Sequence, residues 1–218
     1  NSKLYLFKKL LKKKGNVITD RNILEFNKIR NITKINKLNL NFISEDRKSL
    51  GMKIVSHKYD GDGQIVELIY KKLFFKFKLN LVGKIQLKNV LMASIAAEKS
   101  GIKISDVIKN LYKLKSISGR LEKVGKVKNN SKIILDYAHT PDALKTVLEN
   151  LKNQFPHKKI SIVFGCGGDR DKTKRLSMGK IAEKFCDTIY LTDDNPRNEN
   201  PKMIRKEIKK GIKYKTIN

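Results

Sequence analysis

The chain has 218 residues, of which 39% are apolar, and this is enough to bury the core of one large domain or two small ones. It contains no apolar run of transmembrane length and no signal-peptide pattern, so we expect a cytoplasmic protein without a membrane partner. The formal net charge of +28 suggests nucleic-acid binding, but the lysines are spread along the whole chain together with isoleucine and asparagine. That composition favours codon bias on a solvated surface, so we do not expect a nucleic-acid partner. The two cysteines match no metal-ligand spacing and are predicted to be reduced thiols.

Residues 1–118 are predicted to form a first domain with both helices and strands. Helical periodicity marks residues 2–13, 22–29, 87–99 and 106–114, and β-rich runs mark residues 17–18, 40–44, 52–57, 65–70 and 73–79. The sequence Asp60-Gly61-Asp62-Gly63 is a strong hairpin signal between two of these strands. The chain begins at Asn1 inside a helical pattern rather than at a methionine, so we interpret it as a fragment.

Residues 119–218 are predicted to form a second domain, because the periodicity resets after a linker at residues 115–119. Strands are expected at residues 121–127, 132–135, 160–164 and 188–192, and helices at 141–153, at 177–185 and from 201 onwards. A turn is expected at Asn129 and Asn130, and Thr140 and Pro141 are a typical helix N-cap and first helical residue.

The last part of this pattern reads strand, loop, helix, strand, loop, helix. Such a unit places both loops at the carboxyl edge of one parallel sheet, where open α/β sheets bind ligands. The first loop contains Gly165, Gly167 and Gly168, which we expect to allow positive φ angles and close approach of backbone N–H groups to a ligand. The sequence therefore predicts that the two loops share one crevice.

Polar side chains in these loops suit a small anionic or zwitterionic ligand. Arg170 and Arg197 each carry a planar fork that matches a carboxylate or phosphate, and Asn195 offers both a donor and an acceptor. An alternative is that they are ordinary loop residues with surface ion pairs. In a third loop, Asp136 and His139 follow a strand and could hold a ribose, a phosphate-bound metal or a water, or could serve only the loop and the helix terminus.

Four motifs occur in the order and spacing of the Mur ligases. They are GRLE at residues 119–122, DYAHTPDAL at 136–144, FGCGGDRDKTKR at 164–175 and DNPR at 194–197. LVGKIQLKNVLMA at 81–93 also resembles the end of that family's central domain, with Gln86 as an amide variant of its usual asparagine, and SKLYLF at 2–7 resembles the helix with its carbamylated lysine. The resemblance implies an α/β fold: the end of the central ATPase domain, then a Rossmann-like C-terminal domain with a mostly parallel sheet.

The resemblance implies an ATP-dependent amide ligase of peptidoglycan synthesis that uses Mg²⁺ and acts as a monomer. Its closest type adds meso-diaminopimelate to UDP-N-acetylmuramoyl-L-alanyl-D-glutamate through an acyl phosphate. The roles it implies are catalysis for Lys3 and His139, with carbamylated Lys3 as a metal ligand; ATP binding for Asn89, Arg120, Asp136 and His139; and amino-acid binding for Arg170, Asn195 and Arg197.

Three alternatives remain open at this point. The sequence contains no G-x-x-x-x-G-K-[ST] motif, so the chain by itself is expected to be inactive or a non-catalytic paralogue. A related ligase could add L-lysine or D-alanyl-D-alanine, although an intact DNPR argues against lysine. A basic nucleic-acid-binding module with a Rossmann-like fold is the alternative from another class.

Overall fold

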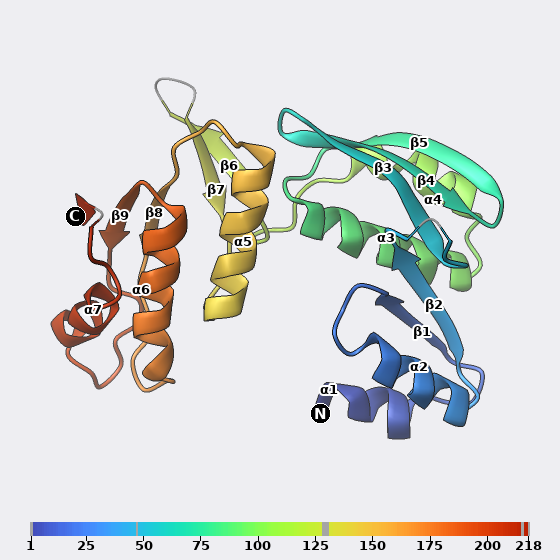
Figure 1. Ribbon diagram of the computed structural model, residues 1–218, viewed down its shortest axis with the longest axis horizontal. Coiled ribbons are helices and arrows are strands. Elements are labelled where there is room, and N and C mark those ends of the chain that lie inside the picture. The colour runs from blue at the N-terminus through green and yellow to red at the C-terminus, as the bar shows by residue number, and fades with distance from the viewer. Residues whose placement is uncertain (1, 47, 128–130, 215, 218) are drawn as a thin grey trace. The chain divides into compact units, whose positions relative to one another are not determined.

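The computed structural model describes residues 2–46, 48–127, 131–214 and 216–217 (Figure 1). The chain divides into two compact units, residues 1–115 and residues 116–218. The division lies at the start of the segment 115–119 that the sequence marks as a linker. No helix among the described residues is both long and apolar enough to cross a membrane.

The first unit begins with a helix that is shorter than predicted. The α-helix α1 (Ser2–Tyr5) continues as the π-helix η1 (Leu6–Leu10), and the N–H of Leu11 closes it by donating to the carbonyl of Leu6 at 3.1 Å. The predicted extension to residue 13 is therefore wrong. A physical reason lies in the lysines at 8, 9, 12 and 13, because like charges four residues apart would repel one another on a continued helix.

A mixed five-stranded sheet forms the centre of the first unit. Its strands are β1 (Asn16–Asp20), β2 (Asn39–Ser44), β3 (Met52–Asp60), β4 (Gly63–Tyr70) and β5 (Leu73–Leu79), in the spatial order β1-β2-β3-β4-β5. The pairs β1–β2 and β2–β3 are parallel, and the pairs β3–β4 and β4–β5 are antiparallel. The predicted hairpin is confirmed, because Asp60 pairs with Gly63 and Gly61 has a φ of 56°.

Helix α2 (Phe26–Ile35) connects β1 to β2 and starts four residues after the predicted position. The side chain of Asp20 accepts a hydrogen bond from the N–H of Asn22 at 2.9 Å. Such a bond holds the chain in a turn, so the helix begins only after it.

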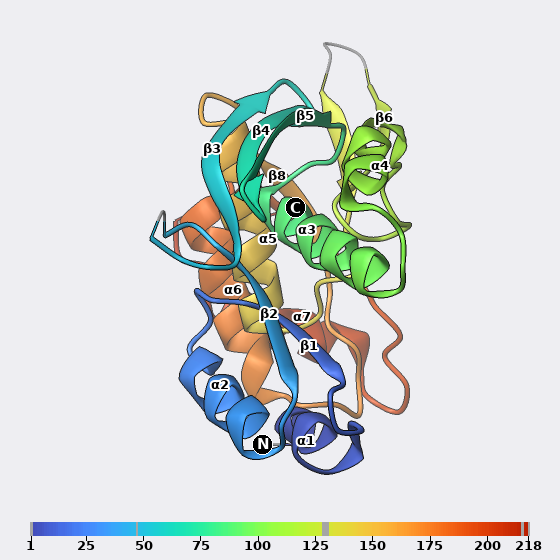
Figure 2. The ribbon, with the colours of Figure 1, turned by 90° about the vertical axis from the view of Figure 1, so that its right-hand side faces the viewer.

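Helix α3 (Lys84–Lys99) covers the sheet of the first unit, and the strands β3 to β5 curve over it (Figure 2). Leu87, Leu91 and Ile95 from one face of α3 are fully buried against strand residues such as Met52 and Leu68. The predicted helix at residues 106–114 divides into α4 (Ile104–Lys109) and the 3₁₀-helix η2 (Leu111–Lys113).

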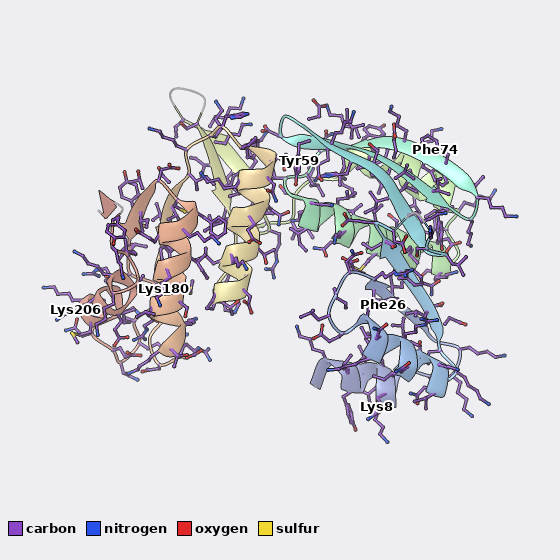
Figure 3. The ribbon with its side chains drawn as sticks, in the orientation of Figure 1. Lys8, Phe26, Tyr59, Phe74, Lys180 and Lys206 are labelled. Atoms are coloured by element: carbon purple, nitrogen blue, oxygen red, sulfur yellow. The ribbon has the colours of Figure 1, made fainter. Side chains whose placement is uncertain are left out.

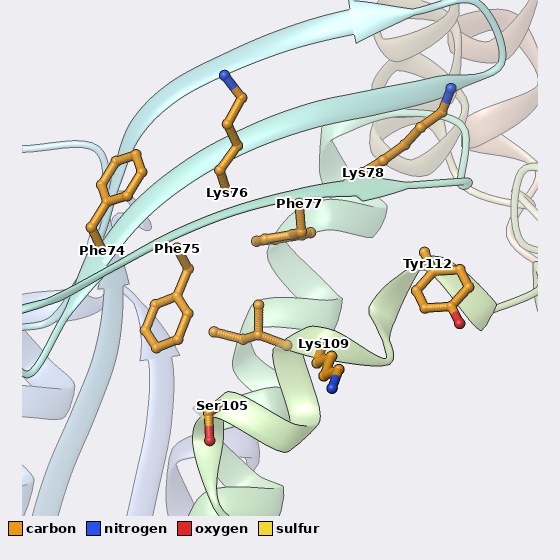
Figure 4. A pocket seen from close by; sticks show the side chains of 9 residues that line it. Phe74, Phe75, Lys76, Phe77, Lys78, Ser105, Lys109 and Tyr112 are labelled. Carbon is orange, nitrogen blue, oxygen red and sulfur yellow. The ribbon is translucent and has the colours of Figure 1, made fainter.

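Strand β5 shows the alternation expected of a strand. Phe75 and Phe77 point toward α4, and Lys76 and Lys78 point the other way (Figure 4). An open cavity of about 540 Å³ lies between β5 and α4. None of the predicted site residues lines this cavity.

The second unit begins with a hairpin of β6 (Glu122–Lys126) and β7 (Lys132–Leu135). The turn predicted at Asn129 and Asn130 lies outside the described residues. Helix α5 (Pro141–Gln154) follows, and the hydroxyl of Thr140 accepts from the N–H of Ala143 at 3.3 Å. The predicted N-cap and the proline at the first helical position are confirmed.

A parallel sheet completes the second unit. Its elements are β8 (Ser161–Phe164), α6 (Thr173–Phe185), β9 (Thr188–Leu191), α7 (Pro201–Lys209) and β10 (Thr216–Ile217). The strands lie in the order β10-β9-β8 and are all parallel, as the repeated strand-loop-helix pattern predicts. Helices α5 and α6 lie side by side (Figure 1), whereas β7 pairs with β6 in a sheet of its own.

Helices α6 and α7 pack closely because two glycines lie where they meet. A Cβ atom on Gly179 would lie 2.2 Å from the carbonyl oxygen of Ile208, and one on Gly211 would lie 2.3 Å from that of Leu176. Neither partner atom can rotate away, since both belong to the backbone. This packing holds α7, and the loop before it, against α6.

We expect the substitution Gly179→Ala to destabilise the protein. Alanine gains about 1 kcal/mol in helix propensity, but overpacking against a backbone carbonyl costs about 1–3 kcal/mol and here requires the helices to separate. Urea unfolding should show a lower midpoint. The control is Gly125→Ala in β6, where a Cβ would meet no atom within 4 Å, and it should change the stability by no more than about 0.5 kcal/mol. Equal midpoints for the two variants would contradict the prediction.

Candidate functional site

The loop after β8, residues 165–172, and the loop after β9, residues 192–200, are in direct contact. The N–H of Gly168 donates to the carbonyl of Asn195 at 3.0 Å, and Nη1 of Arg197 donates to the carbonyl of Gly168 at 2.7 Å. Both loops leave the carboxyl ends of neighbouring parallel strands, which is where such sheets bind ligands. The two loops therefore meet as the sequence predicts.

The glycines serve a different purpose from the one predicted. None of Gly165, Gly167 and Gly168 has a positive φ. A Cβ on Gly165 would lie 2.4 Å from the carbonyl oxygen of Thr192, and one on Gly168 would lie 1.9 Å from that of Pro196. The expectation of positive φ angles is thus wrong: these glycines let one loop approach the backbone of the other.

The positive φ angles belong instead to three residues with side chains. They are 50° at Asp169, 20° at Asn195 and 49° at Arg197. Such a conformation costs about 1–3 kcal/mol for a residue with a side chain and is concentrated at functional sites. This backbone conformation sets the direction in which the side chains of Asn195 and Arg197 leave the loop.

The three predicted amino-acid-binding residues are exposed on these loops. Arg170 makes no hydrogen bond or ion pair with any residue that the structure describes. Arg197 donates one N–H to Gly168, and the rest of its fork makes no hydrogen bond with a described residue, so it can bind a ligand. Asn195 contributes its backbone carbonyl to the loop contact, and its side chain is exposed. The arrangement can bind a small molecule that carries carboxylates.

Arg175 is a residue that the sequence reasoning missed. It lies in the first turn of α6 and is 1% exposed. Its Nη1 donates to Glu199 at 2.9 Å and to Glu207 at 2.7 Å, and its Nη2 donates to Glu199 at 2.9 Å and to the carbonyl of Gly167 at 3.4 Å. The available signal was the spacing of residues 175, 178 and 182, which places Arg175 on the buried face of α6.

Glu199 is held ionised by its surroundings. The hydrogen bond from Arg175, helped by one from the N–H of Asp169 at 2.7 Å, lowers the pKa of Glu199 from 4.5 to about 2. The same contact raises the pKa of Arg175, so the pair stays charged throughout the neutral range.

A second group of predicted residues gathers around the loop after β7. Asp136 Oδ2 accepts the N–H of Leu121 at 2.8 Å, and the guanidinium of Arg120 lies 5.8 Å from the centre of the Tyr137 ring. His139 Nδ1 lies 3.0 Å from the carbonyl oxygen of Tyr137, and it must be the donor in this contact because a carbonyl oxygen only accepts. The structure therefore brings Arg120, Asp136 and His139 into one region of the second unit.

Lys174 connects this region to the two arginine loops. It lies on α6, next to Arg175, and its Nζ donates to the backbone carbonyl of His139 at 2.8 Å. The motif at residues 164–175 includes Lys174, but sequence reasoning assigned this lysine no role of its own.

The remaining predicted residues, Lys3 and Asn89, belong to the first unit. Lys3 lies on α1 and Asn89 on α3, and both are exposed. The neighbour of Asn89, Lys88, binds Asp20 at 2.7 Å and Glu45 at 3.2 Å. Burial lowers the pKa of Lys88, but the hydrogen bonds and charges of these carboxylates raise it more. This network fixes α3, and with it Asn89, against the ends of β1 and β2.

Comparisons with known proteins agree with this arrangement. Residues 119–218 match the family described as "Mur ligase, glutamate ligase domain". The UDP-N-acetylmuramoyl-L-alanyl-D-glutamate--2,6-diaminopimelate ligase of Rickettsia typhi is 39% identical over 212 residues, which are 97% of this chain and 42% of that protein. The ligase of the same name from Zymomonas mobilis is 39% identical over 83% of this chain and 37% of its own length.

The chain belongs to the Mur ligase family.

Solved structures extend the comparison. A structure of a UDP-N-acetylmuramoyl-L-alanyl-D-glutamate--2,6-diaminopimelate ligase aligns with a TM-score of 0.62 and 29% identity, over 98% of this chain and 43% of that one. A folylpolyglutamate synthase from Mycobacterium tuberculosis, solved with ADP, aligns with a TM-score of 0.72 at 16% identity, over 93% of this chain and 44% of that one, and shows the fold alone. The chain thus spans less than half the length of these relatives.

The predicted fold class, an α/β Mur ligase fold with a mostly parallel C-terminal sheet, is confirmed. The assignment of residues 1–118 to the central ATP-binding domain stays a prediction, as do the individual roles of the site residues. In the part of the chain that the structure describes, no three His, Cys, Asp or Glu side chains cluster in a way that could hold a metal ion. The predicted role of Lys3 as a carbamylated metal ligand stays a prediction.

The low pKa of Glu199 predicts how the stability depends on pH. The unfolded chain takes up a proton near pH 4.5, whereas the folded chain resists it until about pH 2. The stabilisation is therefore fully present above pH 4.5 and is lost as the pH falls toward about 2. The difference in urea midpoint between the wild type and Glu199→Gln should narrow when the pH is lowered from about 5 to about 3. A difference that stays constant over this range would contradict the low pKa.

Proposed function

We propose that the protein to which this chain belongs is an ATP-dependent ligase that adds meso-diaminopimelate to UDP-N-acetylmuramoyl-L-alanyl-D-glutamate. The observation that carries the proposal is the contact between the two loops, which places the forks of Arg170 and Arg197 at one sheet edge. The names of the relatives at 39% identity support the choice of reaction.

The second carboxylate of diaminopimelate explains why an arginine suits this site. Diaminopimelate carries an amino acid group at each end, whereas L-lysine has only an amine at the end of its side chain. Arg197 keeps part of its fork unused, and Asn195 beside it offers an amide. We infer that Arg197 binds the distal carboxylate, so that lysine would leave the guanidinium without a partner.

The group around the loop after β7 suits a nucleotide. One carboxylate oxygen of Asp136 holds the N–H of Leu121, and the other makes no hydrogen bond with a described residue and could accept one from a ribose hydroxyl. The exposed Arg120 and the free Nε2 of His139 could meet phosphate and ribose groups. We propose ATP as the nucleotide.

The proposed reaction has two steps. The D-glutamate carboxylate attacks the γ-phosphorus of ATP, which gives an acyl phosphate and ADP. The amine of diaminopimelate then attacks the acyl carbon and loses a proton, the amide C–N bond forms, and the bond between the acyl carbon and the phosphate oxygen breaks, which releases inorganic phosphate. Mg²⁺, when bound, would neutralise the phosphate oxygens. The residues of this chain would hold the amine donor and the nucleotide in line rather than supply a nucleophile.

The proposal predicts a loss of activity in Arg197→Ala. The full-length enzyme, given ATP, magnesium and the UDP-dipeptide, should release phosphate with meso-diaminopimelate and much less with L-lysine. Because Arg197→Ala removes a bidentate, charge-assisted contact, kcat/KM for diaminopimelate should fall about a hundredfold.

The control variant is Lys158→Ala, which removes one exposed positive charge from the same unit and should stay within about twofold of the wild type. Equal use of lysine by the wild type, or an unchanged Arg197→Ala enzyme, would contradict the assignment.

A further inference from the structure

Arg175 connects every element that carries a predicted diaminopimelate contact. Through Nη2 it binds the carbonyl of Gly167, in the loop that carries Arg170. Through both Nη atoms it binds Glu199, two residues after Arg197. Through Nη1 it also binds Glu207 on α7. One buried guanidinium therefore joins α6, both loops and α7.

Arg170 and Arg197 are each linked to the contacts of Arg175 through a neighbouring residue. Glu199 accepts the backbone N–H of Asp169 at 2.7 Å, and Asp169 directly precedes Arg170. Arg197 donates to the carbonyl of Gly168, the neighbour of the glycine that Arg175 contacts. A change in the position of Glu199 would thus move the backbone under both guanidinium groups.

We propose that Arg175 is a positioning residue that sets the distance and direction between Arg170 and Arg197, and so determines how well the enzyme binds the two ends of diaminopimelate. The inference rests on the proposed function. Arg175 is buried, so it acts on the two loops through Glu199 and the carbonyl of Gly167.

The hydrogen bonds of Arg175 to Glu199, Glu207 and Gly167 make this arginine difficult to replace. Two carboxylates, from Glu199 and Glu207, share one guanidinium, and each requires a donor at a fixed angle. Nε of Arg175 has no hydrogen-bond partner in the described part of the chain, so the Nη atoms alone orient the group. A lysine would keep the charge but could not bridge both carboxylates and the carbonyl of Gly167.

The two carboxylates provide a matched pair of variants in the full-length enzyme. Glu199→Gln weakens the connection to the loops, and Glu207→Gln weakens only the connection to α7. We expect Glu199→Gln and Arg175→Lys to raise KM for diaminopimelate about tenfold, since small displacements of binding groups are costly. KM for ATP and for the UDP-dipeptide should stay within about twofold, and Glu207→Gln should raise KM for diaminopimelate by less than about threefold.

Amide hydrogen exchange gives a second readout that does not depend on activity. The N–H of Asp169 should exchange faster in Glu199→Gln than in Glu207→Gln, because only the first variant alters its acceptor. Equal increases in KM for all three substrates, or equal exchange rates in the two variants, would indicate a merely structural role and overturn the inference.

The activity of the wild-type enzyme with diaminopimelate distinguishes a failure of the proposed function from a failure of this inference. If it forms no product with diaminopimelate, the proposed function fails and the inference fails with it. If the wild type is active and KM for diaminopimelate is unchanged in both Glu199→Gln and Arg175→Lys, the inference alone is overturned.

Discussion

The candidate site depends on the close approach of two backbone segments at the carboxyl edge of a parallel sheet. Strands β8 and β9 pair in register, so their loops emerge side by side, and the bond from Gly168 N–H to the carbonyl of Asn195 joins them. That approach requires glycine at the points of contact, because a Cβ on Gly168 would lie 1.9 Å from the carbonyl oxygen of Pro196. Backbone contacts therefore hold the loops that carry Arg170 and Arg197, while the guanidinium groups of these arginines can still bind a ligand.

The contact between the two loops is also stabilised by the buried Arg175. Hydrogen bonds between exposed loops are readily exchanged for water and contribute little by themselves. Beneath them, Arg175 is shielded from water and bound to two carboxylates, and removing one partner of such a group leaves a buried charge uncompensated. The close contact at Gly179 brings α7, and with it Glu207, within reach of α6. Packing of the helices and electrostatics of the loops thus support each other.

Much of the fold follows from local sequence signals. Hydrophobic periodicity gives the boundaries of β5 and β7, and Thr140 and Pro141 mark the start of α5, because caps and alternation are properties of a few adjacent residues. The strand-loop-helix repeat also brings Arg170 and Arg197 together. The carboxylate partners of Arg175 lie 24 and 32 residues away, and the role of the glycines depends on a neighbouring loop. Such features arise from tertiary packing, which periodicity does not encode.

Local rules also fail at positions close to the predicted chemistry. Asn195 and Arg197 adopt positive φ angles although glycine would do so without strain, and a charged Arg175 occupies the apolar face of α6. Selection for stability alone would favour glycine in the loop and an aliphatic residue in the helix. A glycine at 197 would provide no fork, however, and an aliphatic residue at 175 would leave Glu199 without its principal donor. These exceptions are consistent with a loop pair whose side-chain directions matter more than its stability.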